Sequence, residues 1–115
     1  MNKIRLVVNN ESKRNEKEKF FIKKELQSIL NLYAKMVSNG SWKDYSFTSG
    51  IKEVSFNVYQ RASEKPVLRI LKNLKPKYFN EKYLIKDKNG AILKKSENLN
   101  LLINKTSWNK LKLVK

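Results

Sequence analysis

Apolar side chains between residues 16 and 38 recur at steps of three and four, which places them on one face of an α-helix. Acidic residues near the start of this segment suit the positive end of a helix dipole, and Asn15 followed by Glu18 has the spacing of a capping box. Asn39 and Gly40 are typical of a helix end. The pattern predicts one long amphipathic helix over residues 16–38, with an apolar stripe made of Ile22, Leu26, Ile29, Tyr33 and Met36.

After the predicted helix, apolar positions alternate with polar ones, a period of two that is typical of half-buried strands. The clearest case is the trio Val54, Phe56 and Val58, which shares one face of a strand. Asn89 and Gly90 predict a tight hairpin, because both residue types accept a positive φ. The pattern predicts strands over 45–48, 54–58, 67–72, 83–87 and 91–94.

The last part of the chain predicts a short helix that is capped by Ser96 and carries Leu99, Leu102 and Ile103. The expected fold class is therefore α+β: an antiparallel meander of about four to six strands, packed against one long N-terminal helix, with this second helix near the C-terminus. No repeat or long linker divides the chain. The expected organisation is an N-terminal arm or edge strand over 1–15, one domain over 16–104, and a tail or docking strand over 105–115.

The net charge and the absence of two residue types limit the function classes that the chain can belong to. Lys and Arg number 26 against 10 acidic residues, which gives a formal net charge of +16, and the chain has no Cys and no His. Their absence excludes disulfides, Cys or His zinc sites, a Cys nucleophile and His-based acid–base catalysis. A net charge of this size attracts polyanions, of which nucleic acid is the commonest, and it favours RNA or single-stranded DNA as the expected partner.

The positive surplus is concentrated in residues 66–95, where Tyr78 and Phe79 lie between lysines and are expected to anchor a loop in the core. Basic residues with interleaved aromatic ones suit phosphate contact and base stacking. Because lysine predominates over arginine, we expect low sequence selectivity. The predicted binding residues are Arg61, Lys65, Arg69, Lys72, Lys75, Lys77 and Lys82 for phosphate, with Tyr59 as a stacking residue.

Other function classes have less support in the sequence. A protein-interaction adaptor is the main alternative, using an exposed sheet edge or the regions of Trp42 and Trp108. Catalysis is not expected, because the few carboxylates among many cations form ion pairs and are poor proton donors. No cofactor or metal is expected either, since Glu81 and Asp87 lack the spacing of a metal site. The apolar run at the N-terminus is too short for a signal peptide or a membrane-spanning helix. The expected location is therefore the cytoplasm.

Four segments of the chain, taken together, are similar to a known family. They include Trp42-Lys43-Asp44-Tyr45 and the stretch from Phe56 through Arg61-Ala62-Ser63-Glu64 to Pro66, and they lie within residues 25–100. In this order they resemble a small bacterial family known only as a domain of unknown function. The resemblance implies a standalone cytoplasmic domain and supplies no activity, ligand or partner. It indicates four residues as candidates for ordering loops or for interactions: Trp42, Asp44, Tyr45 and Glu64.

Overall fold

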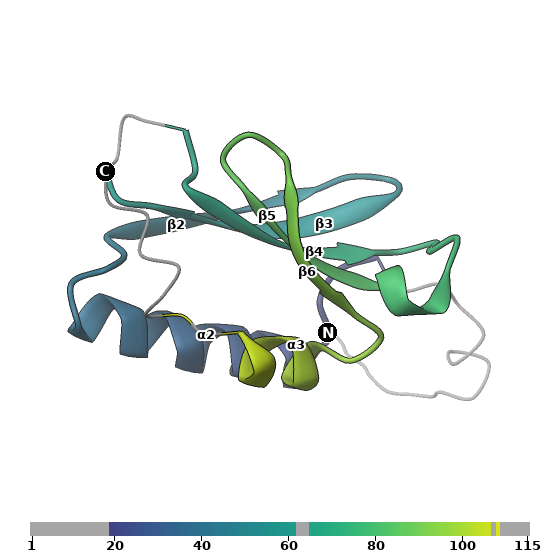
Figure 1. The fold of residues 1–115 in the computed structure, drawn as a ribbon, viewed down its shortest axis with the longest axis horizontal. Coiled ribbons are helices and arrows are strands. Elements are labelled where there is room, and N and C mark those ends of the chain that lie inside the picture. Colours follow the sequence, from purple (N-terminus) through teal and green to yellow (C-terminus); the bar gives the residue numbers. More distant parts are fainter. Residues whose placement is uncertain (1–18, 62–64, 107, 109–115) are drawn as a thin grey trace, which may run out of the picture.

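Among the residues that the structure describes, a five-stranded antiparallel sheet forms one layer of the fold, and two α-helices form the other (Figure 1). The computed structural model describes residues 19–61, 65–106 and 108. This arrangement confirms the predicted α+β class. Its elements are α2 (Lys23–Ser38), β2 (Asp44–Ser49), β3 (Glu53–Tyr59), β4 (Leu68–Asn73), the 3-10 helix η1 (Phe79–Glu81), β5 (Tyr83–Asp87), β6 (Ile92–Ser96) and α3 (Leu99–Lys105).

The strands follow one another in the sheet in the same order as in the sequence, β2-β3-β4-β5-β6. Each neighbouring pair is antiparallel, so the sheet is a meander, as predicted. The hairpin between β5 and β6 is confirmed, with Gly90 at a φ of +88°. The Asp87 carboxylate stabilises this turn, since its Oδ1 accepts hydrogen bonds from the backbone N–H groups of Asn89 and Ala91, each at 2.9 Å.

Helix α2 begins at Lys23, so the prediction of a helix start at residue 16 was wrong for the described residues 19–22. Phe21 is buried and its ring packs edge-on against Phe20 and Phe47, which holds the chain outside the helix at this point. The helix then begins where Glu25 Oε1 accepts a hydrogen bond from the Ile22 N–H at 2.8 Å. The predicted caps Asn15 and Glu18 lie outside the described residues.

Helix α3 is confirmed, but its cap is Asn98 rather than the predicted Ser96. Asn98 Oδ1 accepts a hydrogen bond from the Leu101 N–H at 3.0 Å, whereas Ser96 Oγ accepts one from the N–H of Asn98 at 3.1 Å. Ser96 therefore orders the turn that leads into the helix. A 2.7 Å hydrogen bond from Ser28 Oγ to Asn100 Oδ1 joins α3 to α2.

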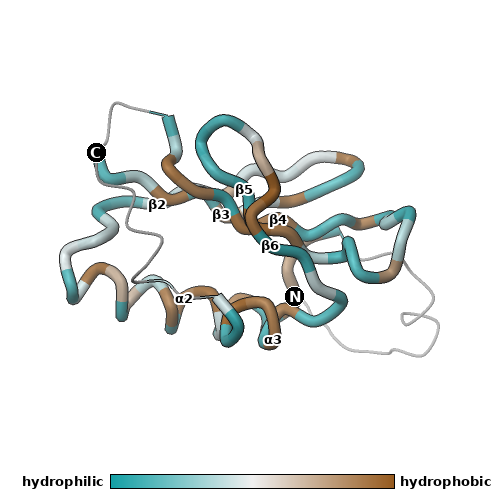
Figure 2. The backbone as a smooth tube through the Cα atoms, in the orientation of Figure 1, coloured by the Kyte–Doolittle hydropathy of each residue, from teal (hydrophilic) through white to brown (hydrophobic). Residues whose placement is uncertain are grey.

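The core lies between the sheet and α2. Ile29 of the helix and Phe56, Ile70 and Ile85 of three adjacent strands have no exposed surface. Hydrophobic segments accordingly run along the middle of β3, β4 and β5, and hydrophilic ones occupy the β5–β6 hairpin tip (Figure 2). Ile29 and Met36 of the predicted stripe are buried in one core with the predicted inward trio on β3, and Leu26 and Tyr33 pack against that core. The prediction was wrong for Ile22, which precedes the helix and is exposed, and it missed Leu32, which is buried.

Candidate nucleic-acid interface

The face of the sheet that points away from α2, here called the outward face, carries a row of three polar side chains across the central strands. Successive strand residues point to opposite faces, so the neighbours of the core residues Phe56 and Ile70 point outward. Asn57 on β3 lies opposite Arg69 on β4, which lies opposite Lys86 on β5. Among residues 19–61, 65–106 and 108, no helix covers this face.

Arg69 and Lys86 place two positive charges directly opposite each other in the sheet. Arg69 is exposed and Lys86 is partly exposed. Neither side chain forms an ion pair within the described part of the chain. Like charges on cross-strand neighbours destabilise a sheet. The pair is therefore a place where a bound anion lowers the free energy of the fold.

Beside this pair, a network of neutral hydrogen bonds covers the outward side of β2 and β3. Asn57 Nδ2 donates to Thr48 Oγ1 at 2.9 Å and to Ser46 Oγ at 3.2 Å, and the Ser55 hydroxyl donates to Asn57 Oδ1 at 2.8 Å. The hydroxyl of Tyr59 lies 3.0 Å from Ser46 Oγ. Tyr59 is thus a half-buried member of this network, which reduces its value as the predicted stacking residue.

The predicted phosphate contacts fall at two opposite ends of the sheet. Arg61 and Lys65 lie in the β3–β4 connection, at the same end as Arg69 near the start of β4. Another three cations lie at the other end, in the connection between β4 and β5: Lys75, Lys77 and Lys82. The six residues of β4 separate these ends by about 20 Å, at about 3.3 Å per residue.

The connection between β4 and β5 exposes two aromatic rings. Tyr78 is 57% exposed and Phe79 is 74% exposed, so the expectation that they anchor the loop in the core was wrong. The ammonium group of Lys77 lies 5.6 Å from the centre of the Tyr78 ring. Lys75, Lys77, Lys82, Tyr78 and Phe79 are called the loop cluster below. The sequence held a signal for their exposure, because the Lys75-Pro76-Lys77 stretch predicts a loop and loops lie at the surface.

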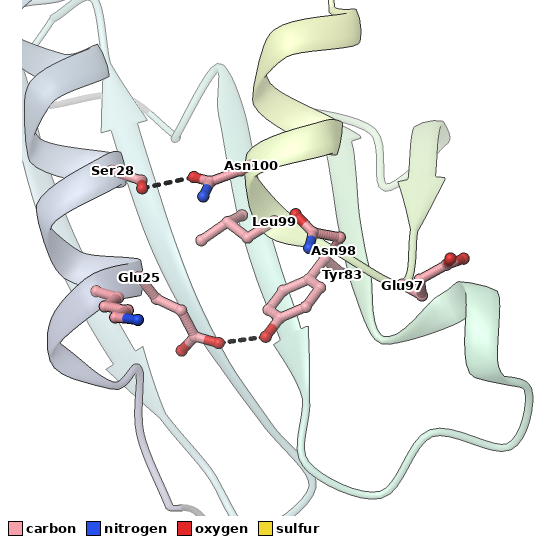
Figure 3. Close-up of a pocket in the computed structure, with 8 residues that line it drawn as sticks. Glu25, Ser28, Tyr83, Glu97, Asn98, Leu99 and Asn100 are labelled. Atoms are coloured by element: carbon pink, nitrogen blue, oxygen red, sulfur yellow. Dashed lines mark hydrogen bonds between the residues drawn. The ribbon is translucent and has the colours of Figure 1, made fainter.

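Lys72 does not belong to any surface, and its prediction as a phosphate contact was wrong. Its side chain is fully buried between the sheet and α2, where its ammonium group donates to Glu25 Oε1 at 2.8 Å and to the backbone oxygen of Phe20 at 3.1 Å. The Tyr83 hydroxyl donates to the other carboxylate oxygen of Glu25, as Figure 3 shows. An ammonium group that is paired inside the core has no access to a phosphate.

A pocket of about 160 Å³ lies between the start of α2 and the start of α3, with Glu25 and Tyr83 at its inner side (Figure 3). The Glu25 carboxylate accepts hydrogen bonds at both oxygens from protein donors: the Ile22 N–H and the Lys72 ammonium group at Oε1, and the Tyr83 hydroxyl at Oε2. A second pocket of about 380 Å³ follows the groove between the two helices as far as Trp108. In the described part of the chain, no group of three or more acidic residues is placed to hold a metal ion.

Two of the residues that the family resemblance indicated, Trp42 and Asp44, make contacts that stabilise the fold. Trp42 is 5% exposed, and its ring packs edge-on against Trp108 at 5.8 Å, so Trp42 is not an exposed docking residue. Asp44 Oδ1 accepts a hydrogen bond from the N–H of Tyr45 and orders the start of β2. Burial, followed by the negative charge of Asp44 and the proximity of Tyr45, raises the pKa of the Tyr33 hydroxyl. Glu64 lies outside the described residues.

Fold and surface together define a small basic α+β domain in which a helical layer covers one sheet face and cations lie on the other. The chain belongs to the family described as "Protein of unknown function (DUF2794)", whose model matches residues 19–103. This match confirms the resemblance seen in the sequence. No curated protein and no solved structure matches the chain. No helix in the described ranges is long and apolar enough to cross a membrane.

Proposed function

We propose that this protein binds single-stranded nucleic acid, RNA or DNA, through the outward face of its sheet, without catalysing a reaction. The observation that carries the proposal is the cross-strand pair Arg69 and Lys86, whose repulsion is uncompensated in the described part of the chain. A phosphate between the two side chains accepts from both and removes the repulsion. A cytoplasmic location, where RNA is abundant, is part of the proposal.

The two basic ends of the sheet define the path of the bound strand across the outward face. Arg61, Lys65 and Arg69 lie at one end and the loop cluster lies at the other. Because β4 separates them by about 20 Å, a strand of several nucleotides that crosses the outward face contacts both ends. Binding sites that span several nucleotides are common among proteins that bind single-stranded nucleic acid.

Exposed aromatic rings favour a single strand over a duplex. Tyr78 and Phe79 expose more than half of their surface beside lysines, and unpaired bases stack on such rings. A duplex hides its base faces and offers them no partner. Lysine is a point charge without the fixed geometry of a guanidinium group, so the contacts attract phosphates without reading bases. The proposal therefore includes low sequence selectivity.

Salt dependence tests the electrostatic part of the proposal. With about six phosphate contacts, log affinity for a short single-stranded oligonucleotide is expected to fall with log salt at a slope of about −4 to −5. Fluorescence anisotropy measures the slope. In the variant Arg69→Gln with Lys86→Gln, we expect the slope to become shallower by about 1 to 1.5.

The matched control removes two positive charges from the helical side instead. Lys24 and Lys35 are exposed on α2, so Lys24→Gln with Lys35→Gln changes the net charge equally and is expected to leave the slope nearly unchanged. The proposal is contradicted by an absence of binding at low salt, by a slope near zero, or by equal effects of the two double variants.

Replacing Phe79 with alanine tests base stacking. Since the ring is 74% exposed, its removal leaves the core intact, and we expect the binding free energy to weaken by about 1–3 kcal/mol, the value of one stacked base. Anisotropy with the same oligonucleotide measures the change. Leu101→Ala, at an exposed apolar position on α3, is the control and is expected to have no effect. Equal affinity of Phe79→Ala and the unchanged protein would exclude stacking at this ring.

A further inference from the structure

The two edges of the sheet differ in how they resist pairing with another strand. At the β6 edge, Lys94 and Lys95 are exposed and the register with β5 is irregular between Ile85 and Lys86, and both features hinder strand addition. Strand β2 forms the other edge and pairs only with β3 among the residues that the structure describes. Its sequence is neutral except for Asp44 at its first position. Within the part of the chain that the structure describes, the β2 edge has no lysine, proline or bulge that would hinder strand addition.

An apolar strip lies next to this edge. It consists of Leu26, Leu30, Tyr33 and Val37 on one flank of α2 and Tyr45 on β2, and the rings of Tyr33 and Tyr45 are 4.8 Å apart. Leu30, Val37 and Tyr45 are each 40–41% exposed. The strip has no charged side chain. Apolar surface that remains exposed beside an unprotected edge is typical of an interaction site.

The charges at the two ends of β2 complement one another. Lys43 and Asp44 are exposed where β2 begins, and Lys52 and Glu53 are exposed just after it ends. When two copies of β2 pair in the antiparallel direction, the beginning of one lies beside the end of the other. Because each end carries one lysine and one acidic residue, each charge then has an opposite charge of the other copy nearby, and neither end brings a net charge to the interface. An edge with this symmetry is complementary to itself.

From these three observations we propose that the protein forms a homodimer, in which the β2 strands of two copies pair antiparallel and the apolar strips pack together. The surface is isologous, because the same residues of both copies meet across a two-fold axis. The axis is perpendicular to the sheet, so the two sheets become continuous and both α2 helices lie on the same side. Because each chain has a net charge of +16, a dimer interface is favoured where it adds little local repulsion, and β2 carries only one charged residue, Asp44.

The oligomeric state of the full chain without nucleic acid tests this proposal independently of the proposed function. We expect light scattering after size exclusion to give the mass of two chains at about 0.15 M salt, where repulsion beyond about 8 Å is screened. A mass of one chain would overturn the proposal, whatever else contacts the β2 edge.

A double variant identifies the surface. Leu30→Glu with Val37→Glu places two charges in the apolar strip at exposed positions and is expected to reduce the mass to one chain. Ile92→Glu with Leu101→Glu adds the same charges at exposed apolar positions of β6 and α3, and it is expected to remain dimeric. Circular dichroism checks that both variants fold. The opposite result, with dissociation only in the second variant, would place the interface elsewhere and contradict the proposal.

A charge exchange tests the pairing direction. Asp44→Lys brings two lysines together at each end of the paired strands and is expected to weaken the dimer about tenfold. Adding Lys52→Glu to that variant restores opposite charges across the interface, so the dimer is expected to recover. A double variant that is as weak as Asp44→Lys alone would exclude the antiparallel arrangement.

Discussion

Replacing Lys72 with methionine is expected to lower the free energy of unfolding by about 3–5 kcal/mol, a large part of the 5–15 kcal/mol typical of a small domain. The cause is the Glu25 carboxylate, which is 7% exposed and whose Oε1 accepts from the Lys72 ammonium group at 2.8 Å. Methionine fills the space of the lysine stem but leaves the carboxylate buried without its positive partner. Urea unfolding followed by circular dichroism measures the change.

Two further variants separate the buried pair from a general effect of losing a lysine. Lys95 and Glu81 form an exposed pair with 3.6 Å between Nζ and Oε2, so Lys95→Met is expected to cost less than about 1 kcal/mol. Adding Glu25→Gln to Lys72→Met removes the unpaired charge and keeps an acceptor for the Tyr83 hydroxyl, so part of the stability is expected to return. A Lys72→Met variant as stable as Lys95→Met would show that the pair contributes little.

The buried pair also shows where prediction from the sequence was limited. Lys72 has the same strand parity as Leu68 and Ile70, which are buried in the core, so alternation along the strand places it on the inward face. It was predicted to contact phosphate because it lies in the most basic stretch of the chain, residues 66–95. Its partner, Glu25, is 47 residues away in the sequence and on another element. Local patterns contain no information on such a pairing.

The fold itself could be predicted because the patterns of α2 and the strands are local. Steps of three and four on the helix and alternation on β3 both follow from where side chains point, and burial of the two apolar faces against each other then gives the layers. The start of α2 was wrong because the packing of Phe21 against Phe47, on β2, decides it.

The candidate interface was predictable only in part. Arg69 was identified from the basic stretch, but its neighbour Lys86 depends on the register between β4 and β5. That register is set by the intervening connection, which includes η1 and has no tight turn with a fixed geometry. The exposure of Phe79 was missed although the Lys75-Pro76-Lys77 stretch predicts a loop, because the orientation of an aromatic ring within a loop depends on the elements beside it.

Replacing Phe56 with alanine is expected to destabilise the domain by about 3–5 kcal/mol through the cavity that it leaves. Phe56 is fully buried at the centre of β3, and its ring contacts Tyr33, Tyr45 and Phe47 at centroid distances of 5.3 to 5.9 Å. These three rings come from α2 and β2, so the loss weakens the packing of both elements against β3. Thermal and urea unfolding measure the effect.

The matched control is Phe79→Ala, which removes the same number of atoms from a ring that is 74% exposed. Its stability is expected to stay within about 0.5 kcal/mol of the unchanged protein. The two phenylalanines thus separate two properties: Phe56→Ala lowers the free energy of unfolding, whereas Phe79→Ala weakens nucleic-acid binding in a protein that folds normally. A large loss of stability in Phe79→Ala would mean that this ring supports the fold, and its assignment to the binding surface would then be wrong.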